Sequence, residues 1–108
     1  MANTYKVLGQ VNPAATTATT LYTASTSLGA VASTLTACNQ GASTTVRVAV
    51  RPAGATLAAQ HYIVYDAVVN ANDTLFLTIG VSLATTDIVT VYAGTANVSF
   101  GLFGSEIT

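Results

Sequence analysis

Charged side chains are scarce in this sequence. Asp, Glu, Lys and Arg together make up 6% of its 108 residues and leave a net charge of −1, whereas an ordinary globular domain is about 25% charged. Nucleic-acid binding requires a basic patch that neutralises phosphates, so we expect no nucleic acid as a partner. Small free monomers usually carry a net charge of about 2 to 8 in magnitude, so a charge this weak favours a subunit of a stable assembly.

Cysteine and long apolar runs are also lacking. Cys38 is the only cysteine, which excludes an internal disulfide and any CxxC metal or redox motif. No window approaches the roughly 18 uninterrupted apolar residues of a membrane-spanning helix, so we expect no membrane partner. The N-terminus shows no charged segment followed by an apolar run, so we expect no secretory leader.

The residues that commonly carry catalysis are too few and too scattered to form a site. His61 is the only histidine, and Asp66 would lie about 16 Å further along a strand and on its opposite face. A general base needs both a nucleophile and an orienting partner within reach. Asp66, Asp73 and Asp87 are spread along the chain, whereas a calcium loop gathers its oxygen ligands in one short turn. We therefore predict no catalytic residues, no metal and no cofactor.

Strand-forming residues are abundant instead. Hydrophobic residues make up 51% of the chain, and much of its polarity comes from 19 threonines, which are good strand residues. About eight strand-like stretches recur at a spacing of about 8 to 12 residues, separated by turn signals, and no helical period exceeds one turn. We predict a single domain over residues 1–108, an all-β antiparallel β-sandwich that is jelly-roll-like, with about eight strands.

Residues 31–52 predict a β-hairpin around which the rest of the chain is organised. Two runs of strand-forming residues flank residues 39–41, whose sequence Asn-Gln-Gly is a polar turn signal. In the second run, valines alternate with Arg47, Ala49 and Arg51. Because successive side chains of a strand point to opposite faces, this pattern indicates a half-buried strand.

The clearest alternation in the chain covers residues 74–83 and predicts one long strand. One face carries five aliphatic residues, Leu75, Leu77, Ile79, Val81 and Leu83, and Phe76 faces the other way. We expect Leu77 and Ile79 to lie in the core. The remaining predicted strands cover residues 5–11, 21–24, 61–66, 88–93 and 98–103.

A few residues stand out as candidate contacts to a partner. Arg47 and Arg51 share one strand face about 13 Å apart, and they either protect a sheet edge as exposed charges or contact acidic groups on another protein. Phe76 lies on either a second buried face or an interface, where aromatic residues are enriched. Residues 12–20 carry no charge and no apolar period, so we predict a flexible loop or N-terminal arm that brings Asn12 and Pro13 to a partner.

Several motifs, taken in order, resemble small β-sandwich virion proteins of tailed bacteriophages. The sequence LYT at 21–23 precedes CNQG at 38–41, and LATTDIVTVYA at 83–93 precedes a last apolar strand at 98–104. Where such proteins often carry a glycine before the Asp, this chain has Thr85-Thr86 before Asp87. The resemblance covers most of the chain from Leu21 on, and it transfers no catalytic residues.

What the resemblance implies is a structural subunit rather than an enzyme. The first possibility is a capsid decoration (cement) protein that bridges and stabilises capsomers, bound to the major capsid protein as a homotrimer on the virion surface after synthesis in the host cytoplasm. The alternative is a head, neck or tail-fibre adhesin subunit that binds the host surface. A fibre usually has a long shaft or coiled coil, which this sequence lacks, so decoration is the favoured hypothesis.

Overall fold

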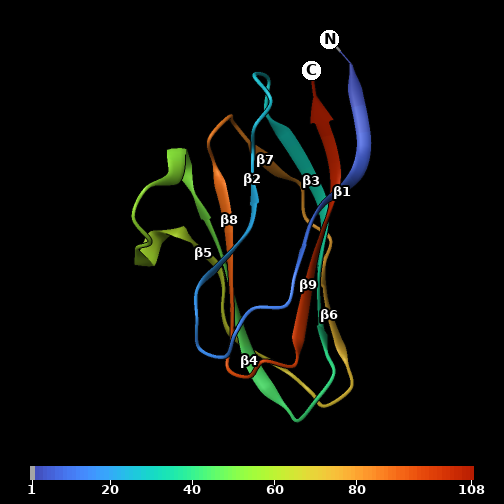
Figure 1. Cartoon of the computed structure of the whole chain (residues 1–108), viewed down its shortest axis with the longest axis vertical. Coiled ribbons are helices and arrows are strands. Elements are labelled where there is room, and N and C mark those ends of the chain that lie inside the picture. The colour runs from blue at the N-terminus through green and yellow to red at the C-terminus, as the bar shows by residue number, and fades with distance from the viewer. Residues whose placement is uncertain (1) are drawn as a thin grey trace.

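Two antiparallel sheets form the body of the structure, a computed structural model that describes residues 2–108 (Figure 1). Sheet A contains β1 (Asn3–Val11), β3 (Ala30–Asn39), β6 (Thr74–Leu77), β7 (Val81–Leu83) and β9 (Val98–Ile107). Sheet B contains β2 (Thr19–Thr23), β4 (Thr44–Arg51), β5 (Tyr62–Val69) and β8 (Ile88–Ala93). Two short 3₁₀ turns, η1 (Pro52–Gly54) and η2 (Ala59–His61), lie between β4 and β5.

The strand order is that of a jelly roll. Sheet A runs β1-β9-β3-β6, with β7 also paired to β3, and sheet B runs β2-β8-β4-β5. The strands β6 and β7 share one position beside β3, so eight strand positions are filled. Only β4 and β5 are consecutive strands that pair with each other; every other connection between positions crosses from one sheet to the other. This confirms the predicted all-β sandwich and its jelly-roll-like arrangement.

The core lies between the two sheets and is built from small and β-branched side chains. On β4 the inward positions Val46 and Val48 are fully buried, as are Val89 and Val91 on β8. Phe100 on β9 is the largest fully buried side chain. Facing sheets pack about 10 Å apart. Valine and alanine side chains from both sheets fill this distance, so the core needs few aromatic residues.

The predicted hairpin over residues 31–52 is wrong. Its first strand, β3, belongs to sheet A, and its second, β4, belongs to sheet B, so residues 39–41 form a corner between the sheets. Asn39 is buried at this corner, where its side-chain amide nitrogen donates to the carbonyls of Ala42, Val69 and Asn70 at 2.9, 3.1 and 3.2 Å. A turn motif predicts a reversal of the chain, and the hydrogen bonds of Asn39 to Val69 and Asn70 hold the corner where the chain passes from sheet A to sheet B.

The predicted strand over residues 74–83 is interrupted. Three residues separate Leu77 from Val81, whereas only two separate their partners Leu35 and Ala32 on β3. The extra residue prevents continuous pairing, so residues 78–80 leave the sheet and β6 and β7 form separate strands. Leu77 packs against the core as predicted, but Ile79 is 45% exposed, and its predicted place in the core is wrong.

Residues 12–20 do not project as an arm. Pro13 is fully buried, and the backbone N–H of Thr16 donates to the carbonyl of Ala93 at 2.8 Å. The Asn12 amide nitrogen, turned toward the carbonyls of Val98 and Ala96, donates to them at 3.0 and 2.9 Å. Thr19 and the residue after it begin β2. The segment crosses the end of the sandwich (Figure 1), so the predicted arm is corrected to a packed connection.

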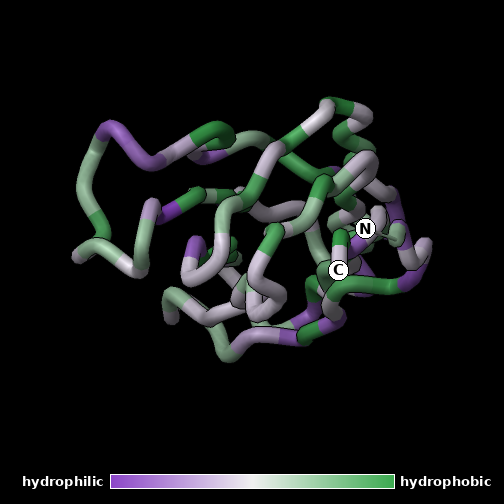
Figure 2. The backbone as a smooth tube through the Cα atoms, turned by 90° about the horizontal axis from the view of Figure 1, so that it is seen from above, coloured by the Kyte–Doolittle hydropathy of each residue, from purple (hydrophilic) through white to green (hydrophobic). Residues whose placement is uncertain are grey.

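The connection between β4 and β5 is the one part that stands out from the sandwich. Seen from above, the segment with η1 and η2 extends sideways from the two layers (Figure 2). Within residues 2–108, no helix has the length and apolar character that crossing a membrane requires.

Candidate functional site

The outer face of sheet A is an uncharged surface with a few exposed apolar side chains. Tyr5 and Val7 on β1 are 82% and 48% exposed, and Phe76 on β6 is 66% exposed. The strand positions between them carry mainly Thr, Ser, Gly and Phe103, and within residues 2–108 no Asp, Glu, Lys or Arg faces outward from this sheet. The absence of charge makes this face a candidate contact surface.

A groove of about 450 Å³ lies in this face. The backbone register places Gly101 of β9 and Phe76 of β6 on either side of Thr36, in one row across the sheet. A Cβ atom on Gly101 would lie 3.0 Å from the ring of Phe103 and 3.1 Å from Thr36 Oγ1. Because glycine has no side chain, it leaves room for the Phe103 ring, which lies over the backbone at Gly101. The groove is lined by Gln10, Asn12, Cys38, Ser99, Gly101 and Phe103, among others.

The edges of both sheets are unsuited to pairing with another strand. The register of β1 shifts between Val7 and Gly9, and that of β2 shifts between Thr20 and Tyr22. The register between β4 and β5 shifts twice, and the fourth edge is interrupted between β6 and β7. Bulges and breaks of this kind disfavour strand addition at an edge. The candidate contact surfaces are therefore the faces of the sheets rather than their edges.

On the outer face of sheet B, the guanidinium of Arg47 lies between two tyrosine rings. Its Cζ atom is 4.3 Å from the ring centre of Tyr65 and 4.4 Å from that of Tyr92. Two nitrogens of the same side chain donate to the Asp66 carboxylate, at 2.6 Å to Oδ1 and 3.3 Å to Oδ2. Tyr62 meets Tyr65 edge-on at 5.0 Å between ring centres. We call Arg47, Tyr62, Tyr65, Asp66 and Tyr92 the tyrosine cluster.

A bulge in β5 builds this cluster. Val46 pairs with Ala67 and Val48 pairs with Val64, so two residues of β5 lie opposite Arg47. One of them, Asp66, has a φ of 54°, a left-handed conformation that Asp tolerates better than most residues. The bulge brings two consecutive residues, Tyr65 and Asp66, to Arg47 on the outer face, which simple alternation would not allow.

The two arginines that share this face differ in their contacts. Asp66 offsets the charge of Arg47, and its hydrogen bonds raise the pKa of that guanidinium above the usual range. Arg51 donates instead to Thr90 Oγ1 and to the carbonyl of Ala55, both at 3.1 Å. Within residues 2–108, neither of the two ion pairs includes Arg51. The guanidinium of Arg51 is therefore not neutralised by a carboxylate of the described residues.

A hollow of about 630 Å³ lies next to the tyrosine cluster. It is lined by Leu57, Ala58, Ala59, Tyr62 and Tyr65, and Tyr65 is 59% exposed. The sequence shows these tyrosines only as bulk within a strand, because the bulge that turns Tyr65 outward has no clear signal in the sequence. The projecting segment between β4 and β5 supplies the opposite wall.

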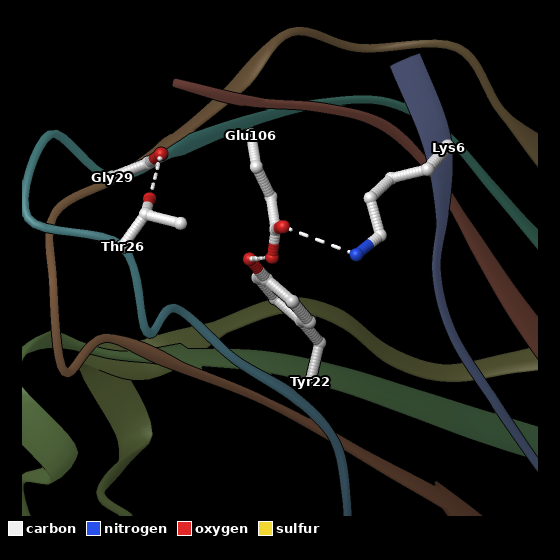
Figure 3. Close-up of polar contacts among 5 residues, drawn as sticks. All are labelled: Lys6, Tyr22, Thr26, Gly29 and Glu106. Carbon is white, nitrogen blue, oxygen red and sulfur yellow. Dashed lines mark hydrogen bonds and ion pairs between the residues drawn. The ribbon is translucent and has the colours of Figure 1, made fainter. Parts of the chain in front are cut away.

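At the other end of the sandwich, Glu106 of β9 links the sheets (Figure 3). Tyr22 of β2 donates its hydroxyl to Glu106 Oε2 at 2.7 Å, and Lys6 Nζ lies 3.1 Å from Oε1. Burial and the hydrogen bond to the carboxylate raise the pKa of Tyr22 above the usual range. The contacts with Tyr22 and Lys6 lower the pKa of Glu106. No local motif indicates this cluster, because its members are far apart in the sequence.

The remaining chemistry-bearing residues have structural contacts. His61 is buried, and its Nδ1 accepts a hydrogen bond from the backbone N–H of Ala58 at 3.0 Å. Asp87 accepts from the N–H groups of Ala53 and Ala84 at 2.8 and 2.9 Å. The part of the chain that the structure describes holds no group of three His, Cys, Asp or Glu side chains suited to a metal ion.

Comparison with known proteins adds no relative. No protein-family model, curated protein or solved structure matches this chain. Two surfaces remain as candidate sites: the uncharged face of sheet A with its groove, and the tyrosine cluster with Arg51 on sheet B.

Proposed function

We propose that this protein is a structural subunit of a bacteriophage virion, a decoration (cement) protein that bridges and stabilises capsomers by binding the major capsid protein. It would be made in the host cytoplasm, act on the capsid surface and catalyse no reaction. The observation that carries the proposal is the outer face of sheet B, where Arg47 lies between two tyrosine rings near an Arg51 that forms no ion pair within residues 2–108, in a chain whose sheet edges are bulged or broken. Such a surface suits a protein that is bound face to face in an assembly.

The jelly-roll fold limits the possible functions of this protein but does not select one of them. Jelly rolls occur in viral capsid proteins and in lectin-like domains, and a fold by itself does not assign a function. The virion role draws on the resemblance of the motifs at 21–23, 38–41 and 83–93 to bacteriophage β-sandwich proteins. The scarcity of charge supports the same role, because a free monomer would need more charge to stay soluble.

Contact with the shell is assigned to the outer face of sheet B. The tyrosine cluster offers rigid aromatic side chains and a guanidinium already held in place, and Tyr and Arg are enriched where interfaces gain most of their binding energy. Arg51 adds a cation that no carboxylate of residues 2–108 neutralises, so an acidic group on the capsid protein is the expected partner. A ligand that binds only the assembled shell stabilises it by mass action, and repetition over many equivalent sites multiplies the effect.

The test measures the lifetime of shells prepared without the protein. Adding the full chain should slow their dissociation on heating or at low salt, and Arg51→Ala should weaken the effect. Asp73→Asn is the matched control, because it removes one charge at the turn before β6 while keeping an oxygen that accepts from the Thr74 N–H. Equal lifetimes with and without the wild-type protein would refute the decoration role.

A second candidate function is favoured by the hollow beside Tyr62 and Tyr65. Exposed aromatic side chains next to a hollow are a typical binding surface for small molecules, and a head, neck or tail-fibre subunit would use such a surface to bind the host. Labelled antibody that finds the protein at the tail tip, together with loss of host-cell binding by Tyr65→Ala, would support this alternative.

A further inference from the structure

The groove in the outer face of sheet A is built around a position without a side chain. Gly101 of β9 pairs with Gln10 of β1 on one side and with Thr36 of β3 on the other. Neighbouring strands lie about 4.8 Å apart, and side chains on one face of a strand recur about every 7 Å. Ser99 and Phe103 therefore border the same position along β9. The groove of about 450 Å³ that these residues line falls within the range of about 300–1,000 Å³ typical of small-molecule sites.

The polar side chains of the groove are neutral and can form further hydrogen bonds. Within residues 2–108, the amide of Gln10 and the hydroxyl of Thr36 form no hydrogen bond, and the Ser99 hydroxyl accepts one long bond of 3.5 Å from Gln40. No buried side-chain nitrogen or oxygen of residues 2–108 lacks a partner, so the unpaired groups are open to solvent. Hydroxyls and amides both donate and accept hydrogen bonds. The groove therefore suits a ligand with several groups that also do both.

Phe103 gives the groove a flat apolar surface. Its ring lies over the backbone at Gly101, where a Cβ atom would come within 3.0 Å of it. The face of an aromatic ring is electron-rich, so it attracts C–H groups that carry a partial positive charge. A sugar ring presents such C–H groups on its faces and hydroxyls around its rim. This chemistry matches a groove with one aromatic ring and several hydroxyl and amide side chains.

We propose that this groove binds a neutral saccharide. A sugar ring packs on Phe103, and its hydroxyls form hydrogen bonds with Gln10, Thr36 and Ser99. A charged ligand gains no ion pair here, because within residues 2–108 no charged side chain faces outward from sheet A. A purely apolar ligand would cover the hydroxyl and amide groups without bonding to them, and each polar group left unpaired opposes binding.

This site goes beyond the proposed function and does not depend on it. Shell binding is assigned to the outer face of sheet B, which lies on the opposite side of the sandwich from the groove. A protein that binds a shell through sheet B therefore directs the groove away from the shell. Both sites can be occupied at once, and each can be tested without the other.

The first test is an NMR titration of the full chain with three neutral trisaccharides: maltotriose, cellotriose and triacetylchitotriose. Concentrations up to about 50 mM cover the millimolar affinities expected of a shallow site. At least one of the three should shift the amide signals of Gly101 and its neighbours in a saturable way. Raising the salt concentration should leave the affinity unchanged, because salt screens only interactions between charges.

Thr36→Val tests the hydrogen bonds, because valine keeps the shape of threonine and removes the hydroxyl. It should weaken binding about fivefold, as expected for one lost hydrogen bond, without lowering the thermal unfolding midpoint. Thr45→Val, on the outer face of β4 in the other sheet, is the matched control and should bind as wild type does. No saturable shift with any of the three trisaccharides, equal binding by Thr36→Val, or shifts centred on Tyr62 and Tyr65 would overturn the inference.

The second test uses Cys38, the only cysteine, which is half-buried and lines the same groove. A saturating concentration of the bound trisaccharide should slow alkylation of Cys38 by N-ethylmaleimide several-fold, whereas the same mass of glycerol should not. Equal rates with and without the trisaccharide would contradict the location of the site. Shell binding is measured separately. A chain that binds a trisaccharide but no shell refutes the proposed function alone, and a chain that binds shells but no trisaccharide refutes this inference alone.

Discussion

The hydroxyl of Tyr22 donates a hydrogen bond of 2.7 Å to the carboxylate of Glu106, and this contact joins sheet B to sheet A. Tyr22 is 8% exposed, so its hydroxyl needs a partner within the protein. The side chain of Glu106 is itself mostly covered and also meets Lys6. We therefore expect the stability of the sandwich to depend on pH at both ends of the scale.

The first prediction concerns alkaline pH. The pKa of Tyr22 is raised above its ordinary value of 10.0, so folding favours the protonated phenol. This stabilisation is fully present below pH 10 and is lost as the pH rises toward the pKa of the folded protein. Tyr22→Phe should lower the free energy of unfolding at neutral pH by about 1 kcal/mol. Urea unfolding from about pH 9 to 11 should show a steeper decline for wild type than for Tyr22→Phe; parallel curves would contradict the prediction.

The second prediction concerns acid. The pKa of Glu106 is lowered from its ordinary value of 4.5, so folding favours the carboxylate. Its contribution is present above pH 4.5 and is lost as the pH falls through the pKa of the folded protein. Glu106→Gln should be less stable than wild type at neutral pH and should lose less stability between about pH 5 and 3. A variant whose stability changes with pH as much as that of wild type would show that Glu106 has no such role.

The third prediction concerns the corner at Asn39. Asn39→Ala removes the donor for the carbonyls of Val69 and Asn70, and a buried polar group left without a partner costs about 1–3 kcal/mol. We expect a loss of this size in the free energy of unfolding, measured by urea denaturation. Gln40→Ala, at the exposed neighbour, is the control and should change stability by less than about 0.5 kcal/mol.

The fourth prediction compares two apolar residues. Phe100→Ala should cost about 3–5 kcal/mol, because Phe100 is fully buried in the core and its truncation opens a cavity there. Ile79→Ala should cost less than about 1 kcal/mol, because Ile79 is 45% exposed in the interruption between β6 and β7. A large penalty at Ile79 would mean that residues 74–83 form the continuous strand that the sequence predicts.

Local patterns predict the strands of this protein well, and their long-range arrangement less well. The alternation of valines with Arg47, Ala49 and Arg51 predicts β4 and its two faces, because burial on one face of a strand imposes a period of two. The turn signal at 39–41 predicts a reversal, but it contains no information on whether β4 returns to the same sheet. Threonine-rich residues 12–20 look like a loop, and the backbone contact of Thr16 with Ala93 that holds them depends on the finished sandwich.

In the candidate sites, too, the sequence predicts local features and misses the long-range contacts. The sequence places Arg47 and Arg51 on one face, as the structure has them. The bulge that turns Asp66 toward Arg47 depends on a register with β4 that no local signal specifies. The sequence does not predict the hydrogen bond between Tyr22 and Glu106 either, because the two residues lie in the first and last thirds of the chain and come together only in the folded protein. Phe76 is singled out by the sequence as facing away from the aliphatic stripe, and the structure leaves it exposed.

We propose that this protein stabilises a bacteriophage shell by binding to it. To test this, shells of the phage that the proposal implies, prepared without the protein, are heated while light scattering follows their dissociation and the purified chain is added. If the protein is a decoration subunit, dissociation should shift to higher temperature, the shift should saturate with added protein, and Arg51→Ala should require more protein to reach it. A dissociation temperature that stays the same at every concentration of wild-type protein would refute the decoration role.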